Sequence, residues 1–354
     1  MEYAHGGDIE SYRRKYGKKP LDFSANINPL GLNRAVKEAI LQELDNLPPY
    51  PDPFCRSLRE KTASYENIKE AYILFGNGAA DLIFRIALVA KPKKALLLAP
   101  TFSEYEQALQ TVDCAIEYYF LKEDKEFSLD EDIVDRLNDI DILFLCNPNN
   151  PTGIAEEKES VLKILKKCKE KNIILVLDEC FNDFLEEPEK YSLKDELAYF
   201  DNLIILKSFT KFFAMAGIRL GYLLTSNREV LEKLYHAAQP WAVSTIAQIA
   251  GIASLSDIAY IEKTKTVIKE ERAYLKKELS EIGFKVYPSM ANYIFFSSEM
   301  KDLNKLTEKK GILIRSCGNY RGLSEEYYRI AVRSREENEA LIKVFKEIRR
   351  QYHG

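Results

Sequence analysis

The chain alternates short apolar runs with amphipathic stretches from about residue 70 to residue 225. The apolar runs are rich in Leu, Ile and Val, with little alternation of polar residues, which indicates strands buried on both faces of a mostly parallel sheet. These predicted strands are 71–76, 94–100, 141–148, 173–179 and 203–209. Helical periodicity predicts helices between them at 79–90, 103–112 and 156–171. The pattern therefore predicts an α/β domain.

The pattern changes after a long helical stretch at 243–280. The later strands alternate more strongly between apolar and polar residues, and helices separate them, which is typical of a smaller α+β module. The first 45 residues lack a strand series and are expected to pack on that module or to arch over the cleft. The predicted division is an N-terminal segment, a large domain and a small domain at 1–45, 46–245 and 246–354.

Composition excludes several classes of protein. With 354 residues, 46% hydrophobic and 30% charged, the chain is expected to form a soluble globular protein with one large and one smaller domain. The net charge of −4 is spread among interspersed acids and bases, so no nucleic-acid partner is predicted. No apolar run approaches the roughly 20 residues of a membrane span, and the polar N-terminus predicts no signal peptide.

Cysteine and histidine usage argues against disulfides and metal. The six cysteines lie far apart and form no C-x-x-C pair, which predicts reduced thiols in the cytoplasm. The chain has only three histidines, so no zinc site is predicted.

Polar residues at the ends of the predicted strands are the first candidates for chemistry, because ligands of an open parallel sheet gather there. The sequence "GNGAAD" (76–81) ends a strand and begins a helix, so the backbone N–H groups at Gly78 and Ala79 could hold a phosphate. An ordinary strand-to-helix turn is the alternative. Asp178 ends another apolar run and brings a carboxylate to the rim of the predicted core.

The segment "SFTKFFAMAGIRLGY" (208–222) is the most specific motif. Lys211 lies there among small and apolar residues, where a charge is costly unless it is paired or used. A lysine in such surroundings has a lowered pKa and can act as a Schiff-base nucleophile. The alternative is a lysine whose ammonium reaches solvent.

Taken together, these motifs resemble those of the fold-type I pyridoxal-phosphate enzymes, the aspartate-aminotransferase-like superfamily. The resemblance rests on Asp178, on "NPTG" at 150–153, and on Ser208 and Lys211 with Arg219 eight residues later, and it runs through nearly the whole chain. It implies a mostly parallel seven-stranded sheet flanked by helices, a smaller α+β domain, and pyridoxal phosphate as cofactor.

The resemblance also implies a role for each cofactor residue. Asp178 would pair with the ring nitrogen, and Lys211, the catalytic residue, would bind the aldehyde. The further contacts would be Asn150 to the ring's O3′, Phe102 stacked on the ring, and Ser208, Arg219, Gly78 and Ala79 around the phosphate. Tyr50 of "PPYPDP" would reach the phosphate of a neighbouring subunit, which implies a homodimer with shared active sites.

Two arginines are candidates for the substrate. Arg329 matches the carboxylate-binding arginine of the superfamily, and Arg315 also lies at a strand end. A planar guanidinium binds carboxylate or phosphate through two parallel hydrogen bonds. Two such residues in one module predict a substrate with two anionic groups, although each could instead be an ordinary surface residue of a strand.

Within the superfamily, the sequence resembles the threonine-phosphate decarboxylases of cobamide biosynthesis more than the histidinol-phosphate aminotransferases. The matching segments run from residue 4 to residue 335 and include "AHGGDIESYRRKYG", "LDFSANINPLG" and "ILIRSCGNYRGLSEEYYRIAVRS". In that subgroup the residues matching His5 and Asn26 line the substrate pocket. A mobile N-terminal residue is the alternative for His5.

Phe181 bears on the choice of reaction. Most aminotransferases of this type have a tyrosine three residues after the aspartate, and its hydroxyl contacts O3′; phenylalanine donates no hydrogen bond. The decarboxylase subgroup also has phenylalanine there. The predicted reaction is therefore decarboxylation of L-threonine O-3-phosphate to (R)-1-amino-2-propanol O-phosphate, with His5, Asn26, Arg315 and Arg329 sharing the anionic groups. The sequence does not assign the phosphate to one arginine and the carboxylate to the other.

Alternatives remain open at this point. O-phosphoserine differs by one methyl group, which is worth only about 1–3 kcal/mol of discrimination. An aminotransferase of the histidinol-phosphate type is the rival enzyme. A third hypothesis is a regulator or scaffold with this fold. It is disfavoured because Asp178, Lys211 and Arg219 are all present.

Overall fold

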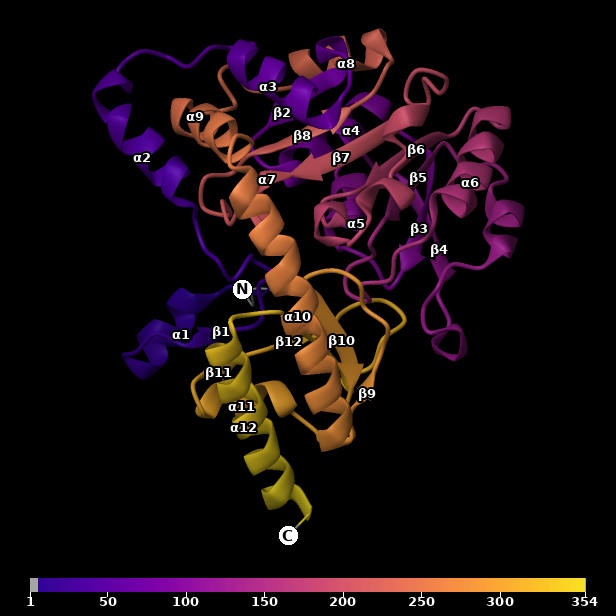
Figure 1. Cartoon of the computed structure of the whole chain (residues 1–354). Coiled ribbons are helices and arrows are strands. Elements are labelled where there is room, and N and C mark those ends of the chain that lie inside the picture. The colour runs from indigo at the N-terminus through magenta and orange to yellow at the C-terminus, as the bar shows by residue number, and fades with distance from the viewer. Residues whose placement is uncertain (1–5, 354) are drawn as a thin grey trace.

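The computed structural model describes residues 6–353, which form a large upper and a smaller lower part (Figure 1). The upper part is built on a seven-stranded sheet of order β2-β8-β7-β6-β5-β3-β4. Only β8 runs antiparallel to its neighbours. The strands are β2 (Ile73–Gly76), β3 (Lys94–Ala99), β4 (Ala115–Phe120), β5 (Ile142–Cys146), β6 (Ile174–Asp178), β7 (Leu203–Ser208) and β8 (Gly221–Leu224). The predicted mostly parallel sheet is confirmed.

Two strands, β4 and β8, were not among the predicted apolar runs. In β4 only Tyr119 is buried and both end residues are exposed, since the strand lies at the edge of the sheet. The strand β8 has four residues, and the first two, Gly221 and Tyr222, are the end of the Lys211 motif. Both therefore lack the long continuous apolar run that reveals a central strand.

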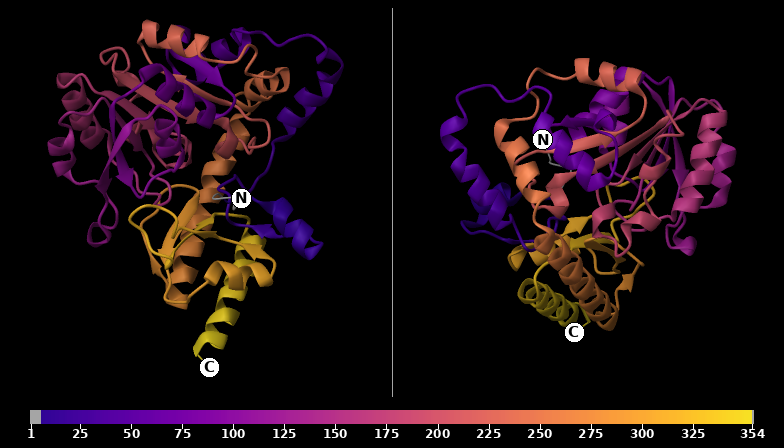
Figure 2. Two further views of the ribbon diagram at one scale, coloured as in Figure 1. Left: turned by 180° about the vertical axis from the view of Figure 1, so that it is seen from behind. Right: turned by 45° about the horizontal axis from the view of Figure 1, so that its top comes forward.

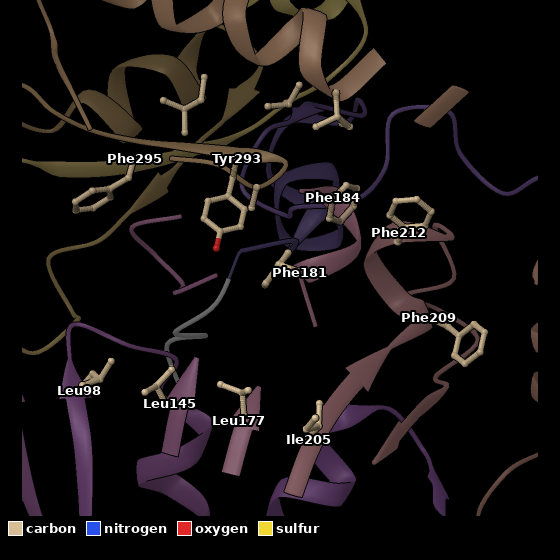
Figure 3. Close-up of a cluster of buried hydrophobic side chains, with 14 of the residues drawn as sticks. Leu98, Leu145, Leu177, Phe181, Phe184, Ile205, Phe209, Phe212, Tyr293 and Phe295 are labelled. Carbon is tan, nitrogen blue, oxygen red and sulfur yellow. The ribbon is translucent and has the colours of Figure 1, made fainter. Parts of the chain in front are cut away.

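Hydrophobic cores cover both faces of this sheet, because successive side chains of a strand point to opposite faces. Leu98, Leu145, Leu177 and Ile205 form a row along four strands on one face, beneath a layer of aromatic rings (Figure 3). Helices α3 (Arg56–Glu66) and α6 (Lys158–Glu170) pack on that face. The opposite face is covered by α4 (Ala79–Ala90), α5 (Glu104–Gln110) and α8 (Arg228–His236).

The lower part is a four-stranded sheet of order β12-β13-β10-β9 with helices against it. Its strands are β9 (Lys285–Val286), β10 (Tyr293–Ser297), β12 (Arg315–Ser316) and β13 (Tyr327–Ala331), and its helices are α10 (Ile258–Ile282), α11 (Leu303–Lys309) and α12 (Arg335–His353). Arg315 of β12 lies opposite Arg329 of β13 in the antiparallel register. The fold therefore makes the two candidate arginines cross-strand neighbours.

The predicted long helical stretch at 243–280 is in fact two helices. Helix α9 (Thr245–Ser254) ends before Ser256, and Asp257 caps α10 by accepting the N–H of Tyr260 at 2.9 Å. A residue of this type favours a helix start, because its side chain satisfies a free backbone N–H. Helix α10 then runs from the upper into the lower part (Figure 1).

The N-terminal segment bridges the two parts. Helix α1 (Ile9–Tyr16) lies beside the lower part and α2 (Arg34–Gln42) beside the upper part (Figure 2). Between them, β1 (Leu21–Asp22) pairs in parallel with β11 (Ile312–Leu313). Asn28 then donates through Nδ2 to the Phe212 carbonyl at 2.7 Å and to Thr264 Oγ1 at 2.8 Å. Asn26 lies on this path, and its carbonyl accepts a hydrogen bond from Nδ2 of Asn292 at 3.0 Å. Within residues 6–353, no helix combines the length and apolar character needed to cross a membrane.

Replacing Leu177 by alanine tests the central strand. Leu177 is fully buried in β6, so the Leu177→Ala variant is expected to lose about 2–5 kcal/mol of unfolding free energy, measured by urea denaturation. Leu88→Ala is the matched control, since Leu88 is 49% exposed and its loss should change that free energy by no more than about 0.5 kcal/mol. Equal losses in the two variants would contradict the assignment of the core.

Candidate active site

A cavity of about 530 Å³ lies beyond the carboxyl ends of β5, β6 and β7. Residues from both parts of the molecule line it. The predicted site residues among them are Asn26, Ala79, Phe102, Asn150, Asp178, Ser208, Lys211, Arg219, Arg315 and Arg329. The fold thus brings together candidates as far apart in the sequence as Asn26 and Arg329.

Asp178 is the last residue of β6, and its carboxylate is almost completely buried. Its Oδ1 accepts the backbone N–H of Cys180 at 2.9 Å, and its Oδ2 accepts the hydroxyl of Tyr105 at 2.5 Å. A carboxylate has about four acceptor positions, so each oxygen keeps one for a ligand in the cavity.

Lys211 lies in α7 (Phe209–Phe212), the short helix that follows β7. The Ser208 side chain caps this helix by accepting the Thr210 N–H at 3.2 Å. Burial lowers the pKa of Lys211, and the charges of Arg219 and Arg329 lower it further, against opposing effects of Cys180 and Glu104. A lysine that loses its proton more readily is a better nucleophile towards a carbonyl group.

The corner at the start of α4 is shaped for a phosphate. Gly78 has a φ of +83°, and a Cβ atom placed there would lie 2.6 Å from Nη2 of Arg219. A Cβ at Gly221 would likewise lie 2.5 Å from the Ala79 nitrogen. Both glycines therefore let backbone N–H groups and the guanidinium approach one another at the positive end of a helix.

Arg329 and Asn150 face each other in the cavity. Arg329 donates through Nη1 to Oδ1 of Asn150 and through Nη2 to the Ser24 carbonyl at 2.8 Å. The first bond fixes the orientation of the amide, so that the N–H groups of Asn150 are free to donate elsewhere. Nε of Arg329, although buried, has no hydrogen-bond partner in the described part of the chain.

Arg315 and Asn26 complete the substrate end. Arg315 donates to Oδ1 of Asn319 at 2.8 Å, and its guanidinium lies 5.4 Å from the ring centre of Tyr320. Asn26 is buried, and within residues 6–353 its Oδ1 accepts no hydrogen bond. Buried polar atoms in proteins are normally satisfied, so this end of the cavity offers polar groups to a ligand.

Some predicted residues lie elsewhere. His5 is outside the described residues. Tyr50 is 76% exposed and stacks on Trp241 with 4.1 Å between ring centres, away from the cavity of its own chain. Its role in a partner's site therefore remains a prediction. Within residues 6–353, no group of three His, Cys, Asp or Glu side chains is placed to bind a metal ion.

The structure adds residues that the sequence prediction did not include. Glu104, Cys180 and Tyr320 line the cavity, and Tyr105 holds Asp178 from behind it. The spacing of Tyr105, three residues after Phe102 at the start of a helix, was the available signal. Phe181 also lines the cavity and packs edge-on against Tyr293 (Figure 3).

Comparison with known proteins identifies the family. The family model named aminotransferase class I and II matches residues 18–345. The chain belongs to this family. The predicted fold class is thereby confirmed, and so is pyridoxal phosphate as the cofactor.

Relatives that carry two different enzyme names are similar to this chain. The threonine-phosphate decarboxylase of Salmonella typhimurium is 38% identical, covering 98% of this chain and 96% of the relative. The histidinol-phosphate aminotransferase of Methanococcus aeolicus is 32% identical, covering 98% and 95%. The crystal structure of the histidinol-phosphate aminotransferase from Clostridium acetobutylicum matches with a TM-score of 0.88 and 32% identity, covering 94% of this chain and 99% of that one.

The cavity fits the cofactor of the family. Asp178 has acceptor positions left over, Lys211 has a lowered pKa, and the Gly78 corner joins a helix start to Arg219. These three features match the groups of pyridoxal phosphate: an acid for the ring nitrogen, an amine for the aldehyde, and a binding corner for the phosphate.

The lowered pKa of Lys211 predicts a measurable titration. In the apoenzyme, the ammonium of Lys211 is expected to lose its proton at a lower pH than the exposed lysines, because burial and two arginines disfavour its charge. NMR of ¹³C-dimethylated lysines measures each midpoint, and Lys211→Ala assigns the signal. In Arg219→Gln the midpoint should rise. A wild-type midpoint equal to that of the exposed lysines would refute this account of the site.

Proposed function

We propose that this enzyme decarboxylates L-threonine O-3-phosphate to (R)-1-amino-2-propanol O-phosphate in cobamide side-chain synthesis. The observation that carries the proposal is the pairing of Arg315 with Arg329 in the register of one sheet, both lining the cavity that contains Lys211 and Asp178. Two adjacent guanidinium groups suit a substrate with both a phosphate and a carboxylate. The similarity to the Salmonella typhimurium decarboxylase supports the same choice.

In this proposal the substrate's two anionic groups are shared among His5, Asn26, Arg315 and Arg329. Arg329 already uses two donors on Asn150 and Ser24, which hold its guanidinium in place. Anchoring both anionic groups fixes the rotation about the bond between the amino nitrogen and Cα. This rotation determines whether Cα loses its carboxylate or its hydrogen. The neutral part of the substrate is small, so the anionic contacts provide most of its orientation.

In this proposal the cofactor residues take the roles that the resemblance implies. Bound pyridoxal phosphate supplies an electron sink for the pair released at Cα. Asp178 holds the ring nitrogen, Asn150 donates to O3′, Phe102 packs on the ring, and Ser208, Arg219, Gly78 and Ala79 hold the phosphate. The bond between Cα and the carboxylate breaks, carbon dioxide leaves, and the ammonium of Lys211 returns a proton to Cα. Its lowered pKa favours that donation.

Phe181 supports decarboxylation over transamination. Its buried ring packs on Tyr293 with 5.0 Å between ring centres and brings no hydrogen-bond donor to the cavity. Asn150 is then the donor available to O3′ among the predicted residues. The second candidate is an aminotransferase acting on histidinol phosphate, favoured by the similarity to enzymes of that name. Histidinol phosphate has a phosphate but no carboxylate, so in that reaction the second arginine would find an anionic partner only in the cosubstrate 2-oxoglutarate.

Product analysis separates the two reactions. The holoenzyme is incubated with L-threonine O-3-phosphate, with L-serine O-phosphate, and with histidinol phosphate plus 2-oxoglutarate. We expect carbon dioxide from the first substrate with no glutamate from the third mixture, and Lys211→Ala as a control should release none. Rapid formation of glutamate without release of carbon dioxide would overturn the decarboxylase proposal. The rate of carbon dioxide release from L-serine O-phosphate, compared with that from L-threonine O-3-phosphate, measures the contribution of the substrate's methyl group.

We further propose a cytoplasmic homodimer, in which Tyr50 reaches the phosphate in the partner's site. Support comes from aromatic side chains exposed on one face: Tyr50 stacks on Trp241, and Phe54 stacks on Tyr235 with 5.8 Å between ring centres. Grouped exposed aromatic residues of this kind mark interaction surfaces. The six free thiols suit a reducing compartment.

Charges placed on this face test the dimer. The double variant Phe54→Glu with Trp241→Glu is expected to sediment as a monomer in analytical ultracentrifugation, because an apolar interface does not accept two buried carboxylates. Tyr199→Glu is the control, since Tyr199 is an exposed aromatic residue too, at 77% against 45% for both Phe54 and Trp241, but lies outside the cluster. Sedimentation of the wild-type protein as a monomer, or of the double variant as a dimer, would contradict the proposal.

A further inference from the structure

The hydroxyl of Tyr105 touches Asp178 from behind the cavity. The two oxygens are 2.5 Å apart, and the ring of Tyr105 is fully buried at the start of α5. The ring stacks on Phe144 with 5.0 Å between centres and meets Phe102 edge-on at 5.6 Å. Packing on both rings therefore fixes the direction of the Tyr105 hydroxyl.

Tyr105 is the donor in this hydrogen bond. Burial, and next the charge of Asp178, raise the pKa of Tyr105 well above its usual value, so the phenol keeps its proton. The thiols of Cys146 and Cys180 near Asp178 are also kept protonated, since burial raises the pKa of both. The phenol of Tyr293 is likewise neutral, because burial raises its pKa. Lys211, Arg219, Arg315 and Arg329 are the cationic side chains that line the same cavity, and Glu104 is its other acid.

We propose that Tyr105 is a positioning residue that donates a hydrogen bond to the Asp178 carboxylate and directs it at the ring nitrogen of the cofactor. A hydrogen bond to the charged form of an acid favours that form and makes it a weaker base. The proton between the two groups then stays on the ring nitrogen, which strengthens the electron sink. The Cys180 N–H on Oδ1 and the Tyr105 hydroxyl on Oδ2 together fix the plane of the carboxylate.

The same tyrosine connects two parts of the cofactor site. Phe102, the residue proposed to pack on the ring, lies against Tyr105, and the acid proposed for the ring nitrogen accepts its hydroxyl. A shift of Tyr105 would therefore disturb both contacts together. This inference rests on the proposed role of Asp178, but it is independent of whether the enzyme decarboxylates or transaminates its substrate.

The test uses Tyr105→Phe, which removes one oxygen and keeps both ring contacts. The holoenzyme is prepared with pyridoxal phosphate labelled with ¹⁵N in the ring, and ¹⁵N NMR reports whether that nitrogen is protonated. We expect the signal to move towards the unprotonated position, and cofactor binding, titrated into the apoenzyme, to weaken about 10- to 100-fold. Asp178→Asn is the reference for complete loss of the charge.

Tyr287→Phe is the matched control. Tyr287 is also buried, and its hydroxyl also donates to a carboxylate at 2.5 Å, but that acid is Glu123, which does not line the cavity. The control should leave the ¹⁵N signal and the cofactor affinity unchanged. Thermal unfolding of the apoenzymes separates a general loss of stability from an effect on the cofactor.

The outcomes distinguish this inference from the role of Asp178. If Asp178→Asn moves the ¹⁵N signal and Tyr105→Phe does not, the proposal for Tyr105 is overturned. If neither variant moves it, Asp178 does not contact the nitrogen, and both proposals fail. If Tyr105→Phe does not fold, ¹⁵N NMR of the wild-type holoenzyme over a range of pH is the remaining test. The inference requires the ring nitrogen to stay protonated between about pH 6 and pH 9. Loss of that proton within this range would refute it.

Discussion

A carboxylate buried at the end of a central strand is the constraint on which the rest of this structure depends. Removing such a charge from water costs several kcal/mol unless hydrogen bonds and an opposite charge compensate it. Tyr105 and the Cys180 N–H supply the hydrogen bonds to Asp178, and the cofactor's ring nitrogen would supply the charge. On the other face of the same strands, the buried ammonium of Lys207 lies 3.7 Å from Glu179 and 3.1 Å from Asp183. Ion pairs on one face and hydrogen bonds on the other thus fix these strand ends from both sides.

The cavity then collects positive charge from both parts of the molecule. Lys211 and Arg219 come from the upper part, Arg315 and Arg329 from the lower part, and Asp178 and Glu104 are the acids among the lining residues. Cations in excess within a partly buried space favour anionic ligands. Because one pair of cations comes from the upper part and the other pair from the lower part, a ligand with several anionic groups would connect the two parts. The N-terminal segment closes the same space, since the Ser24 carbonyl accepts a hydrogen bond from Arg329.

The sequence predicted those features that local patterns encode. Continuous apolar runs identified five strands of the upper sheet, and the predicted site residues make up ten of the twenty residues that line the cavity. Edge strand β4 was not predicted, because its half-exposed residues break the apolar run. The break between α9 and α10 was not predicted either, because only one Asp cap interrupts a continuous helical pattern. Tyr105 was not predicted as a site residue for a different reason. Its helical spacing from Phe102 indicates only that the two side chains are neighbours. The contact of Tyr105 with Asp178 spans 73 residues and that of Arg329 with Asn150 spans 179, so both contacts depend on the tertiary fold.

A crystal structure of the holoenzyme tests the central claim most directly. The account predicts the cofactor covalently attached to Lys211, with its ring nitrogen about 2.7–3.0 Å from an oxygen of Asp178. The Tyr105 hydroxyl and the Cys180 N–H should still contact the same carboxylate in that structure. A cofactor bound to another lysine, or a ring nitrogen directed away from Asp178, would contradict the account.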